Sequence, residues 1–105
     1  MKRVAIGKII KRLEGELTAV HPLQLMKKRL IYRSIAQMRI LQAKLDHLAG
    51  WHNIFILSDN TIVIRQTIVR TQETFWYKFY QTELTVIENP TELENIYVES
   101  YTSMD

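Results

Sequence analysis

The stretch from His21 to Gly50 constrains this chain more than any other. Apart from Pro22 near its start and Gly50 at its end, it contains neither proline nor glycine. Proline suits the first helical position, and glycine suits the left-handed residue that ends a helix. We therefore predict one long helix over Pro22–Ala49. Its apolar residues recur at helical spacing and form one stripe. They are Met26, Leu30, Met38, Leu41, Leu45 and Leu48, with Ile31 and Ile35 at one edge.

The opposite side of this helix is basic, with Lys28, Arg29, Arg33 and Arg39 in a row and Lys27 and Lys44 flanking it. A helix of 28 residues would be ~42 Å long, whereas a compact domain of this chain length is only ~33 Å across. The helix is therefore expected to overhang its domain, unless it breaks or another segment or subunit covers it. Its length makes it the expected site of self-association.

The preceding segment, residues 1–20, is basic and amphipathic. Ile6, Ile9, Ile10, Leu13 and Leu17 have helical spacing, so we predict a short helix from about Arg3 to Glu14. An arm that orders only on binding is the main alternative. A membrane-surface helix is a weaker one, because the apolar face of this segment is small.

After Gly50 the apolar residues become β-branched or aromatic, which favours strands. A turn at Asp59-Asn60 would pair Leu57 with Ile62, and a turn at Gln72-Glu73 would pair Arg65 with Tyr80. Residues 83–88 read as a further strand or as a continuation of the preceding one. Asn89-Pro90 begins a short predicted helix that ends near residue 97. Residues 98–105 are expected to form a strand-like or frayed tail.

These pairings assign two faces to the sheet, because successive side chains of a strand alternate. The face expected to pack against the helix carries Phe55, Leu57, Ile62, Ile64, Ile68, Phe75, Tyr77 and Phe79. The other face carries Val63, Arg65, Thr67, Val69, Trp76, Lys78 and Tyr80. A slip of one residue in the second turn would exchange the faces of the later strand.

The expected fold is α+β, in a single domain over residues 1–105. N-terminal helices, including the long one over 21–50, pack on an antiparallel sheet of three or four strands over 51–88, followed by the short helix and tail of 89–105. A hydrophobic content of 47% and a charged content of 24% are ordinary for a globular domain. There is no cysteine, and no apolar run approaches the length of a membrane span. We expect a cytoplasmic location.

Motifs for catalysis and cofactor binding are missing from the sequence. The three glycines are scattered and form no phosphate-binding loop. His47 and His52 are close in sequence, but they straddle the predicted helix end and have no partner with metal-ligand spacing. No serine or threonine lies in the setting of an activated nucleophile. We therefore expect no metal, no cofactor and no enzymatic activity.

Charge is divided unevenly along the chain. Residues 1–50 carry eleven Lys/Arg and three Asp/Glu, a net charge of +8, whereas residues 51–105 carry three and eight, a net charge of −5. A basic half favours a polyanion such as nucleic acid, an acidic lipid surface or an acidic protein partner. The alternative is that the two halves attract each other, within one chain or between chains.

The leading prediction is a small, self-associating, non-enzymatic binding protein that engages nucleic acid or another polyanion. Lys/Arg would contact phosphates, while Trp76 and Tyr80 could stack on bases. The alternatives for the aromatic face are cross-strand cation–π packing and a subunit contact. The alternative function is an assembly or adaptor subunit. The predicted binding residues are Lys2, Arg3, Lys8, Lys11, Arg12, Lys28, Arg29, Arg33, Arg39, Arg65, Trp76, Lys78 and Tyr80.

Overall fold

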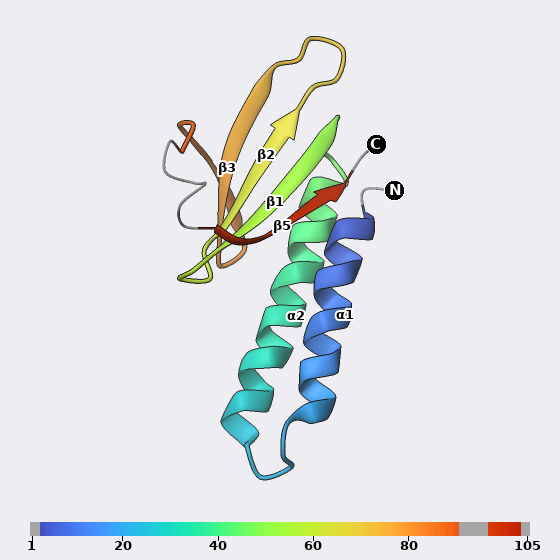
Figure 1. Cartoon of the computed structure of the whole chain (residues 1–105), viewed down its shortest axis with the longest axis vertical. Helices are drawn as coiled ribbons and strands as arrows, with labels where there is room; N and C mark the ends of the chain where they lie inside the picture. The colour runs from blue at the N-terminus through green and yellow to red at the C-terminus, as the bar shows by residue number, and fades with distance from the viewer. Residues whose placement is uncertain (1–2, 91–96, 104–105) are drawn as a thin grey trace.

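The chain folds into two helices followed by an antiparallel sheet, as a computed structural model shows (Figure 1). The structure describes residues 3–90 and 97–103, and the statements below concern these residues. The elements are α1 (Arg3–Ala19), α2 (Leu25–Leu45), β1 (Trp51–Leu57), β2 (Ile62–Thr67), β3 (Thr74–Tyr80), β4 (Glu83–Ile87) and β5 (Tyr97–Ser103). The α+β prediction is thereby confirmed.

The helices α1 and α2 form a hairpin in which they lie side by side (Figure 1). Val20, Ile31 and Ile35 are buried between the helices, packed against Leu13 and Leu17 of α1. The first helix is longer than the predicted Arg3–Glu14, because its apolar residues continue to find partners on α2. Neither helix of the described chain has both the length and the apolar character needed to cross a membrane.

The prediction of one helix over Pro22–Ala49 is wrong at both ends, since α2 runs only from Leu25 to Leu45. Pro22 instead occupies the turn between the helices. In this turn the backbone N–H of Leu23 donates to Nδ1 of His21 at 3.1 Å. After Leu45 the chain tightens into single turns and leaves through Gly50, whose φ of +82° directs it into β1.

The sheet has five strands in the order β4-β3-β2-β1-β5, not the three or four predicted. The additional strand is β5, which pairs antiparallel with β1 although the two are far apart in the sequence. The tail predicted as strand-like or frayed over residues 98–105 is therefore a strand as far as Ser103. The short helix predicted after Asn89-Pro90 falls mostly on residues 91–96, outside the described residues.

The first hairpin is displaced by one residue from its predicted register. Ile56, not Leu57, lies opposite Ile62, because the turn takes in Asn60 at a φ of 68° and closes with Leu57 N–H donating to the carbonyl of Thr61 at 2.9 Å. A slip of one residue reverses the faces of a strand. Phe55 and Leu57 consequently lie on the sheet face away from the helices, not in the helix-facing core.

The second hairpin is displaced by four residues. Its loop closes with the Ile68 N–H donating to the Glu73 carbonyl at 2.9 Å, so Arg65 lies opposite Trp76 and not opposite Tyr80. An even displacement leaves every side chain of β3 on its predicted face. The faces of β2 and β3 were therefore predicted correctly from an incorrect pairing.

The main core lies between the helical hairpin and the inner face of the sheet. Ile54, Ile64 and Phe79 of the sheet are buried against Met38 and Leu41 of α2. A polar contact also fixes the two layers. Gln66, itself buried, donates from Nε2 to the carbonyl of Ala49 at 3.0 Å and accepts from the hydroxyl of Tyr77 at 2.8 Å.

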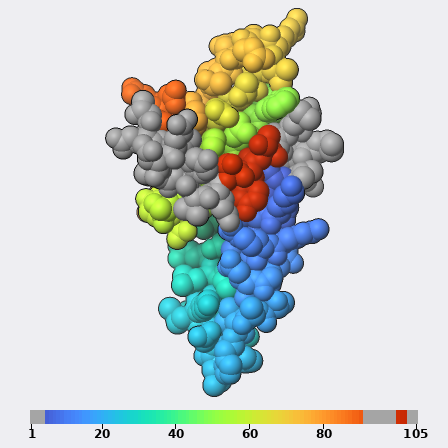
Figure 2. All heavy atoms as spheres, in the orientation of Figure 1, coloured from blue at the N-terminus to red at the C-terminus, as the bar shows by residue number. Residues whose placement is uncertain are grey.

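The molecule is elongated, with extents of 51 × 28 × 20 Å, because the hairpin continues well past the end of the sheet (Figure 1). The overhang predicted from helix length is thus present, although two helices share it. In the space-filling view the molecule narrows to a tip coloured as the connection between α1 and α2 (Figure 2). The start of α2 therefore projects beyond the sheet.

Candidate anion-binding surface

The structure divides the predicted site residues into several places. Arg65 and Trp76 lie opposite each other on the outer face of the sheet, away from the helices. Lys8 and Lys11 are exposed on α1, and Arg29 is exposed near the start of α2. Lys2 lies outside the described residues, and of Arg3 only its position as the first residue of α1 is described.

Arg65 and Trp76 are engaged in packing on the outer face. The Arg65 guanidinium lies 5.6 Å from the Trp76 ring and 5.7 Å from the Phe55 ring, and its Nε and Nη2 donate to Oδ1 of Asn53 at 3.1 and 3.0 Å. Trp76 is only 9% exposed and stacks on Phe55 with the ring centroids 6.0 Å apart. Base stacking needs an open ring face. Arg65 and Trp76 therefore form the cross-strand cation–π packing that was the alternative to base stacking on this face.

Three other predicted residues meet where the sheet ends beside α2. Arg33 of α2 and Lys78 and Tyr80 of β3 line one depression of about 350 Å³. Tyr80 is 65% exposed, and the Lys78 ammonium lies 5.8 Å from the centroid of its ring. An exposed ring beside two cations is the combination that was predicted for polyanion binding, here assembled from a helix and a strand.

A second depression, of about 390 Å³, adjoins the first and shares Gln37, Asn60 and Ile62 with it. We call the two together the corner groove, because they follow the angle between the projecting hairpin and the end of the sheet. Lys27 of α2 and Arg12 of α1 line this second part. Lys27 flanks the basic row of the predicted long helix, but it was not among the predicted site residues.

The cations of the corner groove have acidic neighbours. Arg12 lies 3.9 Å from Glu16, and its Nη1 donates to the Tyr101 hydroxyl at 3.3 Å, so this guanidinium is held in place within the fold. Asp59 lines the groove near Lys78. Hydrogen bonds from the hydroxyl and then the backbone N–H of Thr61 lower the pKa of Asp59, and the charge of Lys78 adds a smaller effect. The groove therefore carries four cations and two carboxylates.

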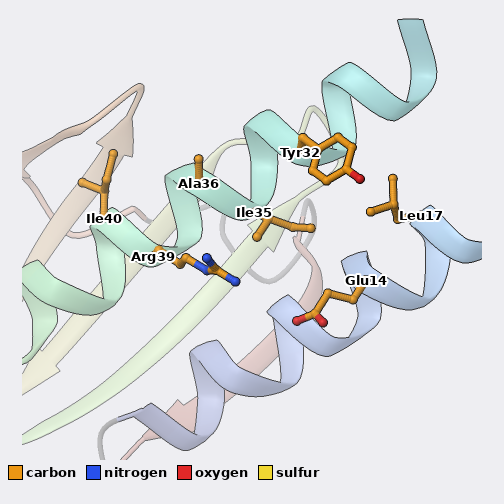
Figure 3. A pocket seen from close by; sticks show the side chains of 7 residues that line it. All are labelled: Glu14, Leu17, Tyr32, Ile35, Ala36, Arg39 and Ile40. Atoms are coloured by element: carbon orange, nitrogen blue, oxygen red, sulfur yellow. The ribbon is translucent and has the colours of Figure 1, made fainter. Parts of the chain in front are cut away.

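Arg39 lies elsewhere, in a groove of about 520 Å³ between the two helices on their side away from the sheet. Figure 3 shows Arg39 from α2 and Glu14 from α1 both extending into this groove, above a floor that includes Tyr32 and Ile35. We call it the back groove. Its charges are balanced and its floor is apolar, so it suits a protein segment better than a polyanion.

The described residues contain no group of three or more His, Asp or Glu that could hold a metal ion. His52 is completely buried on the inner face of the sheet, and His47 is exposed after the end of α2.

One sequence signal was missed. Glu16 and Asp46 are consecutive acids, so residues 17–45 carry six Lys/Arg and no Asp/Glu. This interval covers the free end of the hairpin and the whole of α2. No protein-family model matches this chain, and no curated protein or solved structure matches it either.

Proposed function

We propose that this protein is a small, non-enzymatic binding protein that holds single-stranded nucleic acid or a similar polyanion in the corner groove. The observation that carries the proposal is the convergence of Arg33, Lys78 and the exposed Tyr80 ring in one depression. Two elements more than forty positions apart supply these groups.

Binding would work by charge neutralisation and stacking. Arg33, Lys78 and Lys27 would contact phosphates and release their condensed counterions, which makes the affinity fall steeply with salt. Tyr80 would stack on one base and contribute about 1–3 kcal/mol without selecting among bases. Arg29, exposed one helical turn before Arg33, would extend the phosphate path towards the hairpin tip. Recognition would be dominated by the backbone of the polyanion.

A salt series with a fluorescent single-stranded oligonucleotide tests this proposal. Arg33→Gln and Lys78→Gln should each weaken binding and each reduce the slope of log K against log salt by about 0.7, the value for one single-strand phosphate contact. Tyr80→Ala should weaken binding and leave the slope unchanged. Arg70→Gln is the control, because it removes an exposed cation from the loop between β2 and β3. Wild-type protein that shows no binding at ~50 mM salt, where phosphate contacts are strongest, would refute the proposal.

The second candidate function is self-assembly through the back groove. Its exposed apolar residues include Tyr32 and Ile40, and Glu14 and Arg39 lie beside them. In a two-fold dimer, Arg39 of one copy could meet Glu14 of the other, because a two-fold contact uses the same patch twice. Ala36→Glu would add a charge to the lining of this groove. If the assembly exists, sedimentation should show a dimer for wild-type protein and a monomer for this variant.

A further inference from the structure

The free end of the hairpin exposes a concentration of large apolar side chains. Leu23 is 83% exposed, Leu25 70%, Met26 69% and Leu30 58%. All four lie within eight consecutive residues at the turn between the helices and the first turns of α2. Single exposed apolar residues are ordinary, but a contiguous set at an extremity of the molecule marks an interaction site. We call these four residues the hairpin tip.

Cations surround the hairpin tip, and Glu16 of α1 lines one depression with Lys27 and Leu30. Lys27, Lys28 and Arg29 lie among the apolar residues, and Arg33 follows one turn later. Glu16 and Asp46 are the nearest acids along the chain in either direction. Figures 1 and 2 show the hairpin projecting at this end of the molecule, with the sheet towards the opposite end. The exposed apolar side chains and the cations around them can therefore contact a flat surface without obstruction by the sheet.

The apolar side chains and the cations together indicate the chemistry of the surface that the hairpin tip would contact. A nucleic acid would use the cations, but its phosphate backbone offers nothing to four exposed apolar side chains. A second copy of this tip would bring Lys27, Lys28 and Arg29 against the same three cations, which is unfavourable at close range. An anionic lipid bilayer complements both parts, because its headgroups attract Lys/Arg and its acyl region accepts Leu and Met.

We propose that the hairpin tip docks this protein on anionic lipid surfaces, with Leu25 and Met26 entering the boundary between headgroups and acyl chains. Lys27, Lys28 and Arg29 then lie at headgroup level. The penetration is shallow, about 5–10 Å, as for other interfacial amphipathic elements. The inference shares Lys27 and Arg29 with the proposed phosphate path, but Lys78 and Tyr80 of the corner groove take no part in it.

The test is flotation of the full chain with vesicles of phosphatidylcholine alone and with 30% phosphatidylglycerol. Wild-type protein should float with the anionic vesicles and remain unbound with the neutral ones. Leu25→Ser/Met26→Ser should weaken binding at least tenfold, and both positions are exposed, so folding is preserved. Val69→Ser/Val86→Ser is the matched control, because it removes two exposed apolar side chains from the sheet region.

A second readout reports insertion itself. Leu25→Trp should show a blue shift of its emission on anionic vesicles and quenching by brominated acyl chains, relative to wild-type protein with its own two tryptophans. If the Leu25→Ser/Met26→Ser variant binds anionic vesicles as tightly as wild-type protein, the contact is purely electrostatic. The proposed insertion is then overturned. Absence of vesicle binding at low salt would overturn it as well. A lipid-free dimer abolished by the same double variant would assign the tip to a second copy.

Discussion

Arg65 illustrates how one side chain can look like a ligand-binding group in the sequence and serve packing in the fold. Its guanidinium joins two aromatic rings and an amide oxygen on the outer face of the sheet. Planar geometry makes this arrangement specific to arginine, because lysine presents a point charge and cannot form the same fork. The residue is therefore expected to matter for stability.

Arg65→Lys should lower the free energy of unfolding by about 1 kcal/mol, through the loss of the two-pronged hydrogen bond to Asn53. The measurement is urea unfolding followed by circular dichroism. Lys78→Arg is the control on the neighbouring strand and should leave stability unchanged. A variant with wild-type stability but weakened oligonucleotide binding would instead place Arg65 in the binding surface.

Gly50 is required where the chain passes from α2 to β1. Its φ is +82°, and a Cβ there would collide with the carbonyl oxygen of Thr67. Gly50→Ala should therefore destabilise the protein by about 1–3 kcal/mol. Gly15→Ala is the opposite case, because nothing lies within 4 Å of a Cβ at this helical position. It should stabilise the protein by about 0.5–1 kcal/mol. Thermal melts of the two variants should shift in opposite directions.

Asp59 gives the turn between β1 and β2 a dependence on pH. Its pKa lies below the ordinary value of 3.8 because Thr61 donates to the carboxylate. A lowered pKa in the folded state means that the ionised form stabilises the turn above pH 3.8, and that this contribution is lost as the pH falls through the folded-state pKa. NMR titration of the Asp59 carboxyl should show the lowered value. Thr61→Val should raise it towards 3.8, and an unchanged value would contradict the assignment.

At the scale of elements, periodicity predicted the two helices and the strands of β1 to β3, but not where they end. The apolar stripe correctly marked Met38, Leu41 and Leu45 as core. It also marked Met26 and Leu30, which are exposed because the sheet stops before it reaches them. Helical spacing identifies the apolar face of a helix. It does not show how far along the helix the element that packs on this face extends. The partnership of β5 with β1 was missed for a similar reason, since it depends on a contact distant in sequence.

The register of the first hairpin can be tested by a double-mutant cycle. Phe55 and Trp76 stack on the outer face, whereas the predicted register would place them on opposite faces. Phe55→Leu and Trp76→Leu should therefore show a coupling energy of about 0.5–1.5 kcal/mol in unfolding measurements. Additive effects would support the predicted register. Ile40→Leu combined with Trp76→Leu provides an additive reference from a distant helix.

At the scale of the whole molecule, the uneven charge corresponds to an uneven shape. The basic interval without acids includes the end of an elongated molecule that the sheet leaves free. The uneven charge predicted an anionic partner, and the basic row of the long helix was predicted to contact it; both stay predictions. The meeting of Arg33 with Lys78 and Tyr80 could not be predicted, because it requires knowing how the last residues of β3 lie against the middle of α2.

The proposed function requires that polyanions bind at the corner groove and not around Arg65 and Trp76 on the outer face of the sheet. An NMR titration of uniformly ¹⁵N-labelled protein with a single-stranded oligonucleotide tests it most directly. Amide shifts should concentrate around Arg33 and Gln37 in α2 and around Lys78 and Tyr80 in β3. Shifts centred on Arg65 and Trp76, with α2 unaffected, would contradict it.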